Sequence, residues 1–299
     1  AWTARIGDAV RRVVARQVEC GVDVVSDGEM SKISYATYIR HRLSGFSGDS
    51  PGVVPADLAA HPDYGRMLAG KRGTAAYRRP CCTGPVAFVD RAPLDADLLN
   101  LRAAGAAAGA PDCFMNTASP GVIALFQPDR HYGSHDAYLE AVAEAMRPEY
   151  EAIHAAGVTL QVDAPDLALG RHTLFKDGTE DDFLRIAARH VEVLNHALRN
   201  VPAEAVRVHV CWGNYEGPHH LDVPLERLLP VLLRLRAGAL SFEGANPRHA
   251  HEWVVFRAAR LPEDMVIIPG LLDSTSNYIE HPDLVAERVC RYAGLVGRE

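Results

Sequence analysis

The chain has 299 residues, of which 48% are hydrophobic, so it is long and apolar enough to bury a sizeable core. Its formal net charge is −7 and its basic residues form no long run, which argues against nucleic acid and anionic membranes as partners. No apolar stretch approaches the ~20 residues that a membrane span needs. The six cysteines are scattered as in proteins of the reducing cytoplasm, where we expect this chain to work.

Short apolar segments alternate with long amphipathic segments along the chain. The apolar segments predict strands near residues 22–27, 113–118, 159–163, 206–212, 239–243 and 266–271. Each follows a segment with helical periodicity, and this alternation predicts right-handed βαβ units and a parallel sheet. Because no GxGxxG fingerprint accompanies the strands, the pattern favours a (β/α)8 barrel over a doubly wound sheet.

Two segments depart from this alternation. Residues 41–93 are rich in Gly, Pro, Arg and His, and they predict a long excursion with a strand near "CCTGPVAFV". Pro148 lies inside an otherwise helical segment, which it should kink or split. No linker, repeat or low-complexity tract divides the sequence, so we expect one barrel domain over residues 1–299.

Acidic residues lie at the ends of the first and third predicted strands. In "VVSDGE", Asp27 and Glu29 share one face, at or just beyond the strand end, and in "LQVDAPD" Gln161 and Asp163 share one face. The active sites of barrels lie at these carboxyl ends. Two carboxylates there suit a substrate with a cationic amine, and helix capping or loop bracing is the alternative for each residue.

The segment "AVRVHVCW" places three valines on one face and Arg207, His209 and Cys211 on the other. The Cα atoms of His209 and Cys211 should lie ~6.5–7 Å apart, since alternate strand residues have that spacing. Their side chains can then reach one ion, at ~2.0 Å for Zn–N and ~2.3 Å for Zn–S. A buried histidine beside a buried cysteine is the alternative interpretation.

The next strand, "ALSFEGANP", directs Glu243 to the same side at its end. A carboxylate there needs a partner because an isolated buried charge is very costly. His209, Cys211 and Glu243 therefore predict a three-ligand zinc site with one open position. An ion pair between Glu243 and Arg207 is the alternative.

Together, these strand-end segments resemble the catalytic C-terminal barrel of the cobalamin-independent methionine synthase family, over roughly residues 20–295. The resemblance rests on "DGE", "QVDAPD", "HVCWGN", "SFEGAN" and "PGLLDSTSNYIEHP". It implies a (β/α)8 barrel in which zinc binds a thiol substrate as thiolate, for attack on a methyl donor. It also implies that His209, Cys211 and Glu243 bind the zinc, whereas Glu29 and Asp163 bind the homocysteine amine.

The sequence departs from the family pattern in three ways. The first strand and the last strand, which carries a second zinc-binding cysteine, have no counterpart. We therefore expect a barrel fragment that lacks both strands, with a fourth zinc ligand beyond residue 299. Thr275 stands where longer members carry a histidine, so His281 and Asn277 are the candidate catalytic residues. A folate-stacking Asn-Trp motif is missing, which argues against methyltetrahydrofolate as the donor; a folate and a methylcobalamin-type compound are the two candidate donors.

The sequence thus predicts zinc-dependent transfer of a methyl group to homocysteine or a similar small aminothiol. The same segments resemble epoxyalkane:coenzyme M transferases, so addition of a thiol such as coenzyme M to an epoxide is an alternative. Basic residues in "SKISYATYIRHR" favour that alternative, whereas Glu29 and Asp163 disfavour a sulfonate thiol. A non-catalytic barrel relic is the third interpretation, favoured by the incomplete ligand set.

Overall fold

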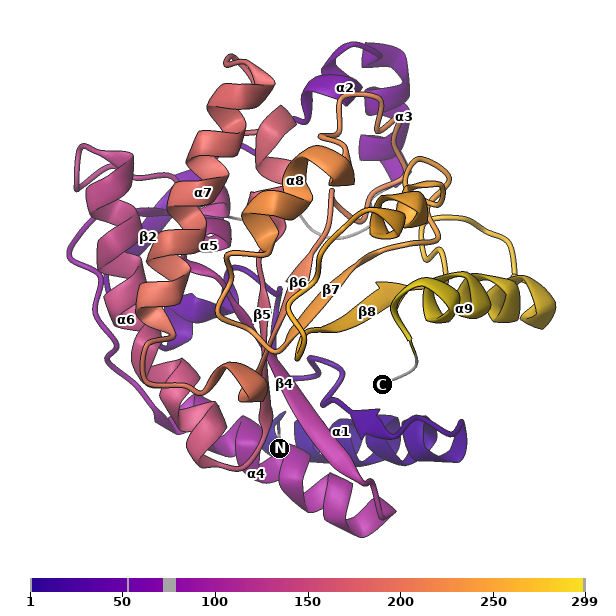
Figure 1. Cartoon of the computed structure of the whole chain (residues 1–299). Helices are drawn as coiled ribbons and strands as arrows, with labels where there is room; N and C mark the ends of the chain where they lie inside the picture. Colours follow the sequence, from indigo (N-terminus) through magenta and orange to yellow (C-terminus); the bar gives the residue numbers. More distant parts are fainter. Residues whose placement is uncertain (1, 53, 72–78, 298–299) are drawn as a thin grey trace. The chain divides into compact units, whose positions relative to one another are not determined.

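The computed structural model describes residues 2–52, 54–71 and 79–297 (Figure 1). Six strands form one sheet in the order β1-β4-β5-β6-β7-β8, and β2 and β3 form a separate pair. The six strands are β1 Val24–Val25, β4 Asp112–Ala118, β5 Thr159–Asp163, β6 Val206–Val210, β7 Ala239–Glu243 and β8 Val266–Gly270. The pairs β1–β4, β4–β5 and β7–β8 are parallel, which confirms the predicted α/β class and strand direction.

One α-helix precedes the first strand, and the others lie between or after the strands along the chain. The helices are α1 Trp2–Glu19, α2 Ala56–Ala59, α3 Pro62–Lys71, α4 Ala92–Ala108, α5 Pro120–Phe126, α6 His135–Ala155, α7 Glu180–Ala197, α8 Leu225–Leu232 and α9 Pro282–Val296. Within the described residues, none of them combines the length and hydropathy that a membrane crossing requires.

Helix α6 runs without interruption through Pro148, so the predicted split is wrong. A proline in a helix interior costs about 3 kcal/mol, because it removes one hydrogen bond and crowds the preceding turn. The apolar face of α6 outweighs this cost. Leu139, Met146 and Ile153 are each fully buried, and burial of one such side chain is worth about 1.5–3 kcal/mol.

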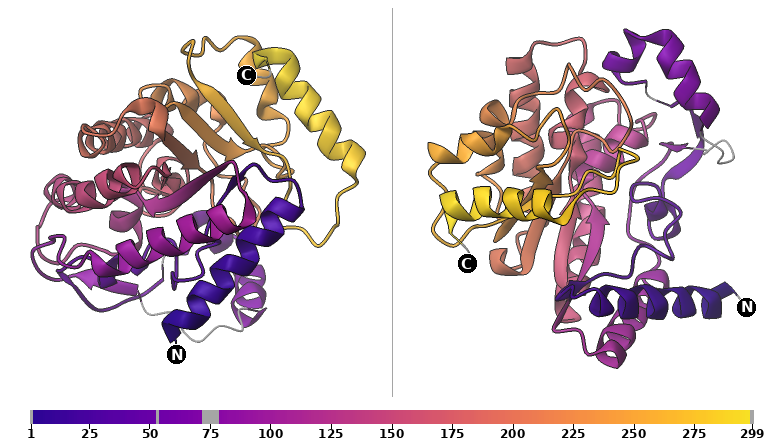
Figure 2. Two further views of the ribbon diagram at one scale, coloured as in Figure 1. Left: turned by 90° about the horizontal axis from the view of Figure 1, so that it is seen from below. Right: turned by 90° about the vertical axis from the view of Figure 1, so that its right-hand side faces the viewer.

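The chain divides into two compact units. The first comprises residues 1–50, 79–163 and 193–207, and the second comprises residues 51–78, 164–192 and 208–299. In the first unit α1 packs against α4, and the two helices lie side by side in Figure 1 and in the rotated views of Figure 2. The single barrel domain over residues 1–299 stays a prediction. The absence of the first and last barrel strands also stays a prediction.

The predicted excursion at residues 41–93 has elements of its own. Strand β2, Phe46–Ser50, pairs antiparallel with β3, Arg79–Cys82, in the first unit. Helices α2 and α3 lie in the second unit. The strand expected near "CCTGPVAFV" therefore exists, but it begins before the two cysteines and ends with them.

Buried side chains alternate along the strands as the sequence predicts. In β6, Val206, Val208 and Val210 are buried, whereas Arg207 and His209 are half-buried. In β7, Leu240 and Phe242 are buried and Ser241 and Glu243 are half-buried. Each strand thus directs its polar residues to one face, which brings the candidate ligands to the strand ends.

A buried ion network joins three segments of the first unit. The Nη2 atom of Arg42 donates to Asp97 Oδ2 at 2.5 Å, and Nη1 lies 2.9 Å from Glu149 Oε2. The hydroxyl of Tyr38 donates to Glu149 Oε1 at 2.6 Å. Burial opposes ionisation of Glu149, but the charge of Arg42 together with hydrogen bonds from Thr117, Tyr38 and Arg42 outweighs it and lowers the pKa of this carboxyl.

Replacement of Arg42 should therefore destabilise the protein strongly. We expect Arg42→Met to lower the free energy of unfolding by about 3–5 kcal/mol, because it leaves Glu149 and Asp97 as uncompensated buried charges. Urea unfolding measures the effect. The control is Arg91→Met, whose ion pair with Asp95 is exposed and should contribute less than about 1 kcal/mol. Equal losses in the two variants would contradict the assigned role of Arg42.

Candidate active site

A cavity of about 240 Å³ lies at the carboxyl ends of β6, β7 and β8 in the second unit. His209 of β6, Cys211 just beyond that strand and Glu243 at the end of β7 all line it. Asn246, Ser274 and Thr275 are among the other residues of its wall. The structure therefore brings the three predicted metal ligands to one cavity.

The carboxylate of Glu243 is held by the end of the neighbouring strand. The backbone N–H of Trp212 donates to Glu243 Oε1 at 3.0 Å. Burial raises the pKa of Glu243, and the hydrogen bond from Trp212 only partly offsets it. A carboxylate in this environment is stabilised by any cation that enters the cavity.

The predicted catalytic residues lie near this region in sequence, but they are not among the residues that line the cavity. His281 caps helix α9, where its Nδ1 accepts the backbone N–H of Asp283 at 3.2 Å, and its side chain is 75% exposed. Ser274 and Thr275 of the preceding loop line the cavity instead of Asn277. A catalytic role for His281 or Asn277 stays a prediction.

Glu29 and Asp163, the predicted amine-binding pair, come together in the first unit around Asn116. The side-chain amide of Asn116 donates to Asp163 Oδ2 at 3.1 Å and also hydrogen-bonds Glu29. Gln161 Nε2 donates to Asp163 Oδ1 at 2.7 Å. Lys32 donates to the backbone oxygen of Asn116 and attracts the Glu29 carboxylate.

Glu29 lies in a strained turn. Its φ of 55° follows the φ of 62° of Gly28, and its N–H donates to Asp27 Oδ1 at 2.9 Å. Positive φ is uncommon for a residue with a Cβ atom and concentrates at functional sites. The Oε1 atom of Glu29 is buried without a hydrogen bond, and burial raises the pKa of its carboxyl. The loop thus holds a carboxylate oxygen that an ammonium group would satisfy.

Arg207, on the same strand face as His209, belongs to the first unit and contacts two residues of that unit. Its Nε donates to Gln161 Oε1 at 2.7 Å, and its guanidinium carbon lies 3.4 Å from the ring centroid of Phe114. The metal-ligand group belongs to the second unit and the acidic pair to the first. Convergence of all five predicted site residues on one pocket stays a prediction.

Substitution of Glu29 should stabilise the fold. A carboxyl group whose pKa is raised by folding costs stability when it ionises, so the cost is absent at low pH and appears as pH rises above 4.5. We expect Glu29→Gln to increase the free energy of unfolding at pH 7 by roughly 0.5–1 kcal/mol, as for other strained functional groups. Denaturant unfolding at pH 7 and at pH 4 measures the difference. An equal gain at both pH values would contradict the role of burial, and Glu19→Gln, at an exposed position, is the control.

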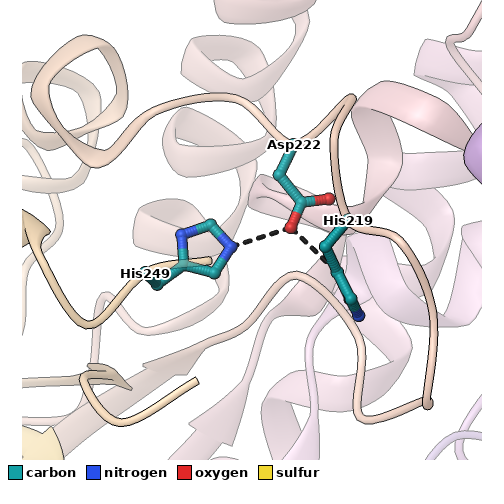
Figure 3. A group of neighbouring side chains, drawn as sticks. All are labelled: His219, Asp222 and His249. Atoms are coloured by element: carbon teal, nitrogen blue, oxygen red, sulfur yellow. Dashed lines mark hydrogen bonds and ion pairs between the residues drawn. The ribbon is translucent and has the colours of Figure 1, made fainter. Parts of the chain in front are cut away.

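The second unit also contains a buried cluster that the sequence analysis missed, formed by His219, Asp222 and His249 (Figure 3). Their ligating atoms all lie within 4.8 Å of one another, so this group can hold a metal ion. Asp222 Oδ2 lies 2.9 Å from His219 Nδ1 and 2.7 Å from His249 Nε2. Burial opposes a charge on His249, but its hydrogen bonds to Asp222 and Glu252 raise its pKa to about 9.

Two short patterns in the sequence mark this cluster. In "HHLD" a histidine precedes an aspartate by three residues, and in "HAHE" a histidine precedes a glutamate by three residues. Each pattern alone is common in turns, so neither indicates a site. Their significance comes from the hydrogen bond between His249 and Asp222, which are 27 positions apart.

Comparison with known proteins confirms the family resemblance that the strand-end segments indicate. The chain is 24% identical to a methionine synthase of Saccharolobus solfataricus over 224 residues, which are 74% of this chain and 57% of that protein. It is 25% identical to a 2-hydroxypropyl-CoM lyase of Xanthobacter autotrophicus, over 97% of this chain and 75% of the lyase. The chain thus spans little more than half the length of the first relative. No protein-family model matches the chain.

A solved structure shares the fold of this chain. The B12-independent methionine synthase from Shewanella superimposes with a TM-score of 0.73, over 97% of this chain and 77% of the other, at 20% sequence identity. Similarity at this identity shows the fold alone.

Proposed function

We propose that this chain, a relative of the cobalamin-independent methionine synthases, transfers a methyl group to the sulfur of a homocysteine-like aminothiol. One observation carries the proposal: His209, Cys211 and Glu243 line one cavity at adjacent strand ends. The methyl donor is a folate or a methylcobalamin-type compound.

The cavity residues fit zinc. An imidazole nitrogen, a thiolate sulfur and a carboxylate oxygen are the donor types of catalytic zinc sites, which keep one position open for the substrate. Glu243 supports the fit because its carboxylate is half-buried and receives the backbone N–H of Trp212, which fixes the orientation of one oxygen. Zinc, when bound, favours the deprotonated form of a thiol, which otherwise has a pKa near ~8.5 and is mostly protonated at neutral pH.

The acidic pair gives the proposal its substrate class. The two oxygens of Asp163 are oriented by amide donors from Asn116 and Gln161, which carry no charge themselves. Glu29 Oε1 lacks a hydrogen bond in the described structure. An ammonium group supplies the three N–H donors and the positive charge that these two carboxylates accept.

Addition of a thiol such as coenzyme M to an epoxide is the second candidate function. It is favoured by the similarity to the 2-hydroxypropyl-CoM lyase over 97% of this chain. Lys32, beside Glu29, supplies a cation of the kind that a sulfonate needs. The two functions use the same predicted zinc ligands, so thiol preference discriminates between them.

Metal content tests the predicted ligands. We expect Cys211→Ser to lose the metal held at the cavity during dialysis, because a hydroxyl is a far weaker zinc ligand than a thiolate. His209→Asn should weaken the same site, whereas Glu29→Gln should leave its metal in place. Zinc is measured by elemental analysis after dialysis. Full retention of zinc by Cys211→Ser would remove Cys211 from the site.

Thiol affinity tests the substrate class. We expect the protein to bind homocysteine more tightly than coenzyme M, and Glu29→Gln to weaken homocysteine binding about tenfold or more, since it removes a charge partner of the ammonium. Calorimetry on the metal-loaded protein measures both affinities. Tight coenzyme M binding together with unchanged homocysteine binding in Glu29→Gln would favour the epoxide reaction. If neither thiol binds, the non-catalytic interpretation prevails.

A further inference from the structure

In the cluster of His219, Asp222 and His249, one ring nitrogen of each histidine faces the same carboxylate oxygen. These atoms are His219 Nδ1, His249 Nε2 and Asp222 Oδ2. His249 Nδ1 lies 2.8 Å from Glu252 Oε2, and His219 Nε2 lies 3.0 Å from the backbone oxygen of Tyr215. A carboxylate and a carbonyl only accept hydrogen bonds, so both of these outer nitrogens carry hydrogens. In a neutral imidazole the inner nitrogen then presents a lone pair.

Both inner nitrogens point at the same acceptor. His219 Nδ1 and His249 Nε2 lie 2.9 and 2.7 Å from Asp222 Oδ2. Figure 3 marks the two contacts with dashed lines. Two lone pairs and a carboxylate oxygen repel one another at these distances, so positive charge must lie between them. Either two additional protons or one divalent cation supplies that charge.

The surroundings of the two histidines are those of metal ligands. Metal-binding histidines almost always donate their outer N–H to a carboxylate or a backbone carbonyl, which fixes the tautomer and the ring orientation. Glu252 and the carbonyl of Tyr215 have these two roles here. Glu252 is itself held in place, because its Oε1 accepts the backbone N–H of Leu225 at 2.8 Å.

A fourth side chain with unused ligand atoms adjoins the cluster. His172 is 1% exposed, and neither of its ring nitrogens has a side-chain hydrogen-bond partner. Its Nε2 lies 3.5 Å from Asp222 Oδ1, which also lacks a hydrogen bond, and its Nδ1 lies 3.8 Å from Asp57 Oδ1. Buried polar atoms with few hydrogen bonds are costly, and a bound ion would stabilise both His172 and Asp222.

We propose that His219, Asp222 and His249 bind a divalent transition-metal ion of the zinc class, with His172 positioned to complete the ligand set. This site is separate from the cavity of His209, Cys211 and Glu243, and the proposal does not depend on the proposed function. Imidazole nitrogen with one carboxylate suits zinc and its neighbours, whereas calcium and magnesium prefer sites made of oxygen alone. Because the ligands are 1–6% exposed, the ion is structural and has no open position for substrate.

The ion would also stabilise the wall of the cavity. The ring of Trp212 stacks on His249, with centroids 3.9 Å apart and planes 20° apart. Its Nε1–H donates to the backbone oxygen of Val223 at 2.7 Å, and its backbone N–H holds Glu243. An ion that fixes His249 therefore fixes Trp212, and through its backbone the orientation of the Glu243 carboxylate.

Cobalt(II) binding tests the site in a full-length background from which the cavity ligands have been removed. We expect Cys211→Ser/His209→Asn, after chelator treatment, to bind one equivalent of cobalt(II). The bound ion should show d–d absorption without a thiolate-to-cobalt charge-transfer band, since every ligand is nitrogen or oxygen. Addition of zinc should displace it, and a chelator should lower the midpoint of thermal unfolding of this variant.

Further substitutions locate the ion. His249→Asn in the same background should abolish cobalt binding and the effect of the chelator on thermal unfolding. His251→Asn, at an exposed position two residues away, should leave both unchanged. If the His249 variant does not fold, the cobalt stoichiometry of the parent background decides the question.

Absence of bound cobalt and zinc in the Cys211→Ser/His209→Asn background would overturn the proposal, and two protons would then hold the cluster together. Retention of cobalt by folded His249→Asn would also overturn it. A thiolate-to-cobalt band in the wild type reports on the cavity alone. Absence of this band in the wild type would therefore count against the proposed function. It would not count against the proposed site at His219, Asp222 and His249.

Discussion

Each carboxylate of the candidate sites is wholly or partly removed from water. Removal of a charged group from water costs free energy, and the surrounding groups reduce this cost for most of these carboxylates. Asp163 receives two side-chain amides, Glu243 receives the backbone N–H of Trp212, and Asp222 faces two histidines. Glu29 keeps one buried oxygen without a hydrogen bond. Buried charges that are only partly compensated favour bound cations, so both units present groups that would gain from an ammonium or a metal ion.

The strands determine where these carboxylates lie. Parallel strands end at the same edge of a sheet, and alternate residues of a strand share one face. In β6 and β7 the apolar residues are buried, which leaves His209 and Glu243 on the other face at the ends of the strands. The cavity at these ends is therefore a consequence of the same alternation that forms the core.

Trp212 links the cavity to the buried histidines within the second unit. Its ring is fully buried and stacks on His249, and its backbone N–H fixes Glu243. The residue after a candidate zinc ligand thus stacks on a histidine of the polar cluster. The position of the Glu243 carboxylate therefore depends on the hydrogen bonds or the ion that fix the His249 ring.

The sequence by itself determined the strands, their parallel direction and the family resemblance, because strand alternation and strand-end motifs are local patterns. The same patterns assigned His209, Cys211 and Glu243 to one face, and the structure places these three residues on one cavity. Only the tertiary structure revealed the cluster of His219, Asp222 and His249, whose contacts join loops that are distant in sequence. It alone also showed that Pro148 is accommodated in an unbroken α6, since the buried apolar face of that helix outweighs one lost hydrogen bond.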